Sequence, residues 1–249
     1  YYYNSYYNRS INFYDVNNNT VRKIKDYKDK AVYDVFATDS KFYVVYRDGG
    51  NPNPIIYYVD ELNIETEKVE STHNVTEFVA DNYNSYIRTI GVDSKGRIYL
   101  TTFDGLKSEK NYTIHLLSKD YKELSSADME DDCFEYYGFD SSNGNFYFES
   151  YKTAKSQWGS SSGYRTLAFG NVTNNKITVS DEILDILYAK YVQYHYSSAI
   201  MLTEDTLAWT SSYNSTVNVL DSSKFDTKNP NNPPLLGSLS RAGYEGDDE

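Results

Sequence analysis

Residues 90–105 read Ile-Gly-Val-Asp-Ser-Lys-Gly-Arg-Ile-Tyr-Leu-Thr-Thr-Phe-Asp-Gly, and this pattern decides the fold. Residues 93–96 predict a tight turn, because Asp can hydrogen-bond to its own backbone and Gly tolerates a positive φ. Residues 97–103 are rich in β-branched and aromatic side chains, which favour a strand. Asp104-Gly105 is a second turn signal. The stretch therefore predicts two strands joined by a polar turn.

Variants of this unit recur along the chain. Each copy has a turn acid with an aromatic strand behind it, and the turn acids are Asp39, Asp93, Asp140 and Asp205. Four strands in roughly 45–50 residues, repeated, are typical of the blades of a β-propeller. One four-stranded sheet cannot bury both of its faces alone, whereas blades stacked around an axis bury them against each other. A meandering β-sandwich is the alternative fold.

We therefore predict an all-β protein with a β-propeller domain over residues 1–240 and about five four-stranded blades, followed by an acidic tail or linker at 241–249. The predicted units are 1–26, 27–71, 72–127, 128–180 and 181–225. The first unit lacks an innermost strand, and two interpretations stay open. In one, residues 234–240 supply a closing strand and complete a ring of five blades. In the other, the chain is part of a larger propeller of six to eight blades.

The sequence motif Asp-Ser-Lys-Gly-Arg-Ile-Tyr at residues 93–99 resembles the blades of NHL-type and gluconolactonase-like propellers. The resemblance covers a turn of about seven residues per blade, and other propeller families have the same motif. It implies the fold. It also implies one enzymatic alternative, a gluconolactonase-like hydrolase that uses a metal on the propeller axis.

Charge and composition disfavour some classes of binding partner. Acidic residues outnumber basic ones by 36 to 24, for a formal net charge of −12 over 249 residues. Nucleic acids and anionic membranes bind positive surfaces, so the charge disfavours both. No run of 18 apolar residues occurs, so no membrane-spanning helix is expected. The single cysteine, Cys133, excludes an intramolecular disulfide framework.

The residues that commonly carry chemistry do not form a recognisable site. The histidines His73, His115 and His195 share no His-x-x-x-His spacing, which disfavours zinc. An acidic stretch could ligate calcium, but its spacing does not match Asp-x-Asp-x-Asp-Gly. It consists of Asp128, Glu130, Asp131, Asp132 and Glu135. We predict a solvated acidic loop at 128–132 and no cofactor.

Residues 151–163 read as a long polar insertion between strands, and such loops are often functional. Trp158 lies within it, and Tyr151 and Tyr164 bracket it. An exposed aromatic ring can stack on a sugar or anchor a protein partner, although Trp158 could equally fold back on its blade. His195 lies between two tyrosines on a strand expected to face the axis. These four residues are the candidate binding residues.

The pattern favours a non-catalytic recognition or scaffold domain of a secreted or cell-surface protein. We expect a monomer that binds a protein or a glycan through its blade-connecting loops. The alternative is a propeller enzyme, either lactonase-like or a glycan-processing hydrolase or lyase. Such an enzyme needs carboxylates and a His or Asn that converge at the central channel.

Overall fold

The computed structural model describes residues 10–15, 18–27, 30–50, 53–129, 132–140, 144–155, 161–179, 197–203, 206–211, 216–221, 224 and 235–240. Apart from one short 3-10 helix, η1 (Thr76–Phe78), the regular structure in these residues is all strand. The predicted acidic tail at 241–249 lies outside the described residues. The all-β prediction is confirmed.

The described strands form five antiparallel sheets, and neighbours along the chain are neighbours in each sheet. The first is a pair, β1 (Ser10–Asp15) and β2 (Thr20–Asp26). The second holds β3 (Ala31–Ala37), β4 (Lys41–Gly50), β5 (Asn53–Asn63) and β6 (Val69–Asn74). The third holds β7 (Tyr86–Val92), β8 (Ile98–Phe103), β9 (Tyr112–Leu117) and β10 (Glu123–Met129). The fourth holds β11 (Asp132–Asp140), β12 (Asn145–Lys155), β13 (Ser161–Thr173) and β14 (Lys176–Val179). The fifth holds β15 (Ser197–Thr203), β16 (Thr206–Ser211), β17 (Thr216–Asp221) and β18 (Leu235–Ser240).

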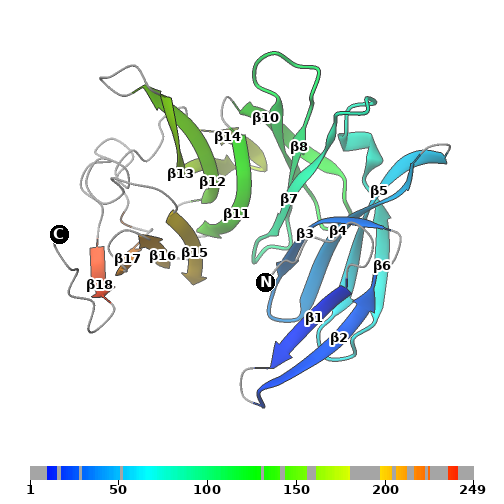
Figure 1. Ribbon diagram of the computed structural model, residues 1–249, viewed down its shortest axis with the longest axis horizontal. Coiled ribbons are helices and arrows are strands. Elements are labelled where there is room, and N and C mark those ends of the chain that lie inside the picture. The colour runs from blue at the N-terminus through cyan, green and yellow to red at the C-terminus, as the bar shows by residue number, and fades with distance from the viewer. Residues whose placement is uncertain are drawn as a thin grey trace.

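The first strand of each four-stranded sheet lies toward the middle of the molecule (Figure 1). There β3 contacts β7, β7 contacts β11, and β11 contacts β15. The other strands of each sheet follow in order away from these first strands. The four sheets are therefore joined along one inner edge each, which is how the blades of a propeller are arranged.

The third sheet shows that both faces of a sheet are covered. On β8, Ile98 and Leu100 pack in a buried cluster with Val59 of the second sheet. The residue between them, Tyr99, packs in a different cluster with Phe146 of the fourth sheet, and the two ring centroids are 5.2 Å apart. Successive side chains of a strand point to opposite faces. A two-layer sandwich covers one face of each sheet, so this packing favours stacked blades.

Asp93 forms the turn that the sequence predicts. Its Oδ1 accepts hydrogen bonds from the backbone N–H groups of Lys95 and Arg97, both at 2.9 Å. Its Oδ2 accepts from Arg97 Nε at 2.8 Å and from the hydroxyl of Tyr99 at 3.1 Å. Gly96 follows with φ +72°, which the missing side chain permits. The carboxylate thus fixes the turn and the start of β8 together.

In the second sheet the corresponding position belongs to Thr38. The backbone N–H of Thr38 donates to Lys41 O at 2.9 Å, and Lys41 N–H donates back to Thr38 Oγ1 at 3.1 Å. The prediction that Asp39 is equivalent to Asp93 is therefore wrong by one residue, because Thr38 occupies that place in the turn. A threonine hydroxyl accepts the same kind of backbone hydrogen bond as a carboxylate, so the turn does not need an acid at this position.

Three other predictions need correction. Residues 234–240 do not close a ring through the first sheet, because β18 pairs with β17 and completes the fifth sheet. The stretch 128–132 is not a loop throughout, because β10 runs to Met129, which is buried, and β11 begins at Asp132. The strands β6 and β10 also extend beyond the predicted unit ends at 71 and 127. In β6, β10 and β11 pairing with the neighbouring strand outweighs the local polarity of the sequence.

The predicted insertion at 151–163 is mostly strand. The β12–β13 ladder continues without a register shift from Asn145↔Asn171 to Lys155↔Ser161. Only residues 156–160, which include Trp158, lie outside the described part of this hairpin. Cross-strand pairing thus makes most of this polar stretch part of a long hairpin.

Gly170 tests the packing between the third and fourth sheets. It pairs with Phe146, and a Cβ atom at this position would meet the Phe146 ring and lie 2.5 Å from Thr178 O. Phe146 is fully buried against Tyr99, so it has no space to move into. We expect Gly170→Ala to destabilise the protein by about 1–3 kcal/mol in urea denaturation. Gly237→Ala is the matched control, because no atom lies within 4 Å of a Cβ there; equal midpoints for both variants would contradict this packing.

Candidate functional site

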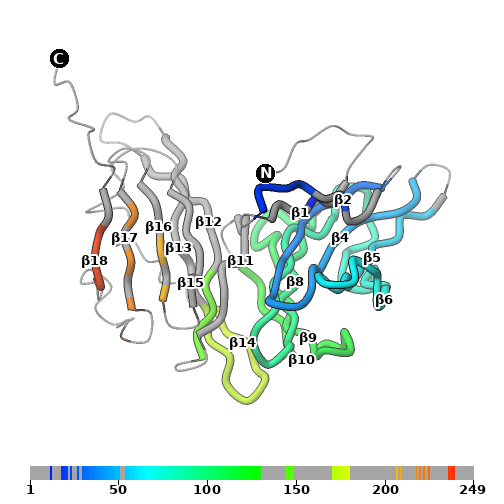
Figure 2. The backbone as a smooth tube through the Cα atoms, turned by 90° about the horizontal axis from the view of Figure 1, so that it is seen from below, coloured from blue at the N-terminus to red at the C-terminus, as the bar shows by residue number. Residues whose placement is uncertain are grey.

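One face of the molecule carries the connections between sheets and the turns between the second and third strands of each sheet. We call it the link face, and in the described chain it comprises the β4–β5 tip, residues 75–85, residues 104–111 and the far ends of β12 and β13. In Figure 2 the β4–β5 tip lies along the upper side of the molecule and the β13–β14 turn at its lower side. Connections of this kind carry the binding residues of many scaffolds.

Two of the four predicted binding residues lie on the hairpin that extends toward the link face. Tyr151 of β12 pairs with Arg165, and Tyr164 of β13 pairs with Lys152. Asp132, the first residue of β11, pairs with Tyr151, so the hairpin continues beyond the first strand of its sheet. The structure thus brings Tyr151 and Tyr164 one register position apart. Trp158 and His195 lie outside the described residues.

Two other loops of the link face are fastened together by Asp104. Its Oδ1 accepts hydrogen bonds from Asn82 Nδ2 at 2.9 Å, from Ser85 Oγ at 3.3 Å and from Leu106 N–H at 3.1 Å. These bonds, with Leu106 N–H the strongest cause, lower the pKa of Asp104. Tyr83, between Asn82 and Ser85, stays 84% exposed. Sequence reasoning identified Asp104 only as a turn former and missed the loop that it binds.

The interior of the second sheet contains adjacent carboxylates that point to opposite faces of β5. Asp60 is fully buried and accepts hydrogen bonds from the hydroxyls of Tyr27 at 2.9 Å, Tyr46 at 3.2 Å and Thr72 at 2.6 Å. Burial beside this carboxylate raises the pKa of the Tyr27 and Tyr46 hydroxyls, which stay protonated donors. Because Tyr27 follows β2, Asp60 joins the first sheet to the second.

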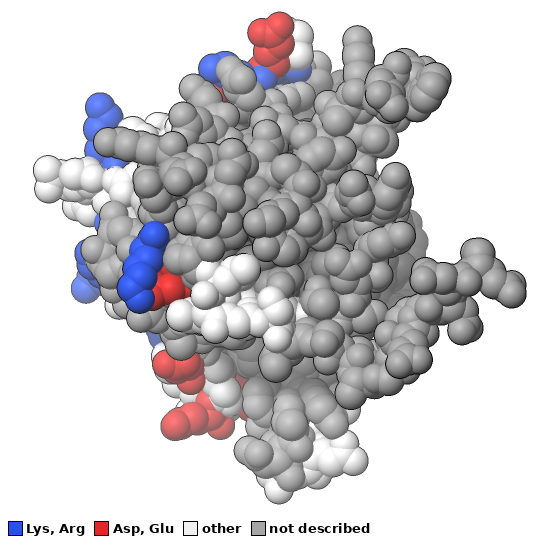
Figure 3. Space-filling model, turned by 90° about the vertical axis from the view of Figure 1, so that its left-hand side faces the viewer, with Lys and Arg blue, Asp and Glu red and all other residues white. Residues whose placement is uncertain are grey.

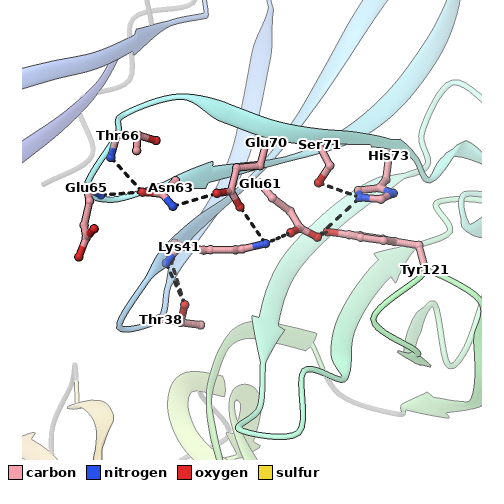
Figure 4. Close-up of polar contacts among 10 residues, drawn as sticks. All are labelled: Thr38, Lys41, Glu61, Asn63, Glu65, Thr66, Glu70, Ser71, His73 and Tyr121. Carbon is pink, nitrogen blue, oxygen red and sulfur yellow. Dashed lines mark hydrogen bonds and ion pairs between the residues drawn. The ribbon is translucent and has the colours of Figure 1, made fainter.

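Glu61 faces the third sheet, as Figure 4 shows. Its carboxylate accepts from Lys41 Nζ at 2.7 Å and from the hydroxyl of Tyr121 at 3.1 Å, and His73 Nε2 lies 3.6 Å away. The His73 and Tyr121 rings stack with centroids 3.9 Å apart. The bond to Glu61 raises the pKa of Lys41. Each partner holds Glu61 to a neighbouring strand or sheet. The cluster therefore crosslinks the second and third sheets rather than offering a reactive group.

His115 takes part in an arrangement that resembles a catalytic relay. Its Nε2 lies 3.1 Å from Thr102 Oγ1 and its Nδ1 lies 2.8 Å from Glu123 Oε1, as in a hydroxyl–imidazole–carboxylate triad. Thr102, however, is only 6% exposed, and the Phe78 ring packs 5.4 Å from the imidazole. A substrate carbonyl cannot reach the buried hydroxyl. These residues link β8, β9 and β10 across one face of the third sheet.

The inner strands carry one carboxyl group with an unusual environment. Asp34 of β3 accepts hydrogen bonds from its neighbour Val35 N–H and from Ile90 N–H of β7, both at 2.8 Å. Burial raises the pKa of Asp34 to about 6, although the two N–H groups and the nearby Arg88 oppose the shift. A carboxyl group that titrates near pH 6 on an inner strand can exchange protons near neutral pH. It is the described group that best suits the enzymatic alternative.

Other sites are less well supported. Among the described residues, no three His, Cys, Asp or Glu side chains are placed to hold a metal ion. The acid Asp128, predicted as part of a solvated loop, accepts a hydrogen bond from Thr113 Oγ1 at 2.7 Å within the third sheet.

The described charged side chains seen in Figure 3 include both signs at the left and upper edges. The described chain contains no helix with the length and hydropathy to cross a bilayer.

No family model matches this sequence, and no curated protein matches it. Solved structures match its fold. A luciferin-regenerating enzyme is 12% identical with a TM-score of 0.55, over 93% of this chain and 69% of that chain. A protein of unknown function from Bacteroides caccae is 13% identical with a TM-score of 0.50, over 81% of this chain and 68% of that chain. The neighbours have propeller folds, so the chain has a propeller-like all-β fold.

Asp34 gives a pH-dependent test of this geometry. Because its pKa is raised in the folded protein to about 6, its favourable contribution is complete below about pH 4 and is lost as the pH rises through 6. We expect the stability of Asp34→Asn relative to the wild type to increase between pH 4 and pH 7 by about 2 kcal/mol. Urea denaturation at several pH values measures this difference. A difference that is independent of pH would show that Asp34 is not desolvated.

Proposed function

We propose that this chain is a non-catalytic recognition or scaffold propeller of a secreted or cell-surface protein, which binds a protein or a glycan through loops of the link face. The observation that carries the proposal is the β12–β13 hairpin. It extends past the first strand of its sheet with a continuous ladder and brings Tyr151 and Tyr164 toward the link face. A backbone ladder that continues in register suits recognition, because little flexibility is lost on binding.

The interior supports a scaffold in the same way. Asp60, Glu61 and Asp93 are buried and bound by several donors each. Their hydrogen bonds connect strands and sheets, and groups engaged in this way are poorly placed to exchange protons with a substrate. We further infer that each of the five sheets is one blade and that the turn at Asp93 is of the NHL or gluconolactonase-like type.

A central-channel enzyme is the second candidate, and Asp34 is the observation that favours it. Its carboxyl group lies on an inner strand, with a pKa raised to about 6 and Arg88 nearby. In a lactonase-like or glycan-processing reaction Asp34 would act as the general base, and His195 would be the second group at the channel. A metal such as calcium would add Lewis-acid chemistry there.

Trp158 tests the recognition function. We expect Trp158→Ala to weaken binding to glycan or surface-protein arrays by roughly tenfold or more, because Trp residues are frequent centres of binding energy. The thermal unfolding midpoint should not change. Trp158→Phe is the matched control, since it keeps an aromatic face and should retain most of the binding. Array partners that bind all three proteins equally would place the binding site elsewhere.

Metal content separates the two candidates. If the chain is a recognition domain, the protein purified in the presence of calcium and zinc should retain less than one equivalent of either after dialysis, measured by mass spectrometry. A metalloenzyme should retain one equivalent, and Asp34→Asn or His195→Gln should remove it, because each variant loses a ligand. Asp128→Asn is the control on the outer strand β10. Retention that depends on Asp34 or His195 would overturn the recognition function.

A further inference from the structure

We propose that Tyr83 and Leu106 form the centre of a docking surface on the link face for a protein partner, one that offers apolar side chains flanked by Lys or Arg. The proposal rests on the recognition function above and adds a site and a partner class to it. The two residues belong to different loops, residues 81–85 and 104–107, which Asp104 fastens together. We call these two loops the fastened loops.

The fastened loops are rigid before any partner binds. Asp104 Oδ1 binds Asn82 and Ser85 on one loop and Leu106 N–H on the other. Within the first loop, Asn82 Oδ1 accepts Asn84 N–H at 3.1 Å. Gly105 lies so close to Asn84 that a Cβ atom would be 2.9 Å from Asn84 O. Loops held in this way lose little conformational entropy on binding, so exposed side chains on them can contribute most of their contact energy.

Both apolar side chains point away from the core. Tyr83 is 84% exposed and Leu106 is 68% exposed. The residues at the base of the two loops are instead packed: Tyr86 and Phe103 pair across β7 and β8 with ring centroids 5.1 Å apart. The core therefore holds the fastened loops without using Tyr83 or Leu106. Exposed apolar residues on loops that are joined to each other are typical of protein-binding sites.

The charges around the fastened loops favour a basic partner. The acids in residues 76–85 and 104–111 are Glu77, Asp81, Asp104 and Glu109, and the bases are Lys107 and Lys110. Lys107 Nζ lies 3.5 Å from Asp128 on β10, so part of its charge is compensated within the protein. With a net charge of −12 for the chain, the surface attracts Lys and Arg beside the partner's apolar side chains.

A glycan suits these residues less well. A sugar that stacks on Tyr83 also needs polar groups beside the ring for its hydroxyls. The amide of Asn82, which adjoins Tyr83 in the sequence, already donates to Asp104 and accepts from Asn84 N–H. Leu106 offers a sugar neither a flat face nor a hydrogen bond. A protein partner can cover both exposed side chains with apolar groups of its own.

A displayed library of random 15-residue peptides is the probe. We expect selection on the wild-type protein at low salt to enrich peptides that combine apolar residues with Lys or Arg. Tyr83→Ala and Leu106→Ala should each weaken these peptides by roughly tenfold, while Tyr83→Phe should keep most of the affinity. Leu236→Ala and Val21→Ala are matched controls, since these exposed apolar residues lie on β18 and β2, and both should bind as the wild type. Raising the salt concentration should weaken binding.

Three results would overturn the proposal. Either no peptide is enriched, or the enriched peptides bind Tyr83→Ala as tightly as the wild type, or a glycan array shows binding that Tyr83→Ala abolishes. The last result would assign the fastened loops to a glycan. If array partners respond to Trp158→Ala while no peptide responds to Tyr83→Ala, the recognition function stands and this surface fails. If nothing responds to either variant, both fail.

Discussion

Burial of both faces of the central sheets is the constraint on which the rest of the structure depends. A strand in such a sheet must suit two different neighbours at alternate positions. On β5, Val59 and Glu61 face the third sheet, while Asp60 faces the opposite way. Asp60 and Glu61 are both buried, so each carboxylate must find its hydrogen bonds within the protein. The hydroxyls of Tyr27, Tyr46 and Tyr121 provide them across the sheet boundaries.

This constraint also determines where a function can lie. Polar groups between sheets are committed to holding the sheets together, as Glu61 holds Lys41 and Tyr121. The available surfaces are the inner edge and the two faces formed by the turns and connections. On the inner edge Asp34 has a distinctive environment, because it is desolvated and binds the next sheet through Ile90 N–H. On the link face the distinctive features are the extended β12–β13 hairpin and the fastened loops.

The sequence predicts the strands well because their signals are local. The turn at Asp93 and the strand behind it depend on residues within seven positions of each other. What it does not reveal depends on distant pairing. The register shifts beside Tyr33 and Arg88 have no clear local signal, and they determine that Asp34 faces the next sheet. Asp104 binds Asn82 and Ser85 about 20 residues earlier, a contact that exists only once β7 and β8 are paired.

The repeat itself explains why its most visible residues maintain the fold. The same register shift recurs at the same place in β3, β7 and β11, and the residues that follow it are Asp34, Thr89 and Glu135. The backbone is therefore conserved between sheets while the side chain is not: Asp34 binds Ile90 N–H, whereas Thr89 donates to Thr101 within its own sheet. Repeated features maintain the stack of sheets, which every blade requires. A binding site needs a position where one sheet departs from the others, as Asp34 and Asp104 do.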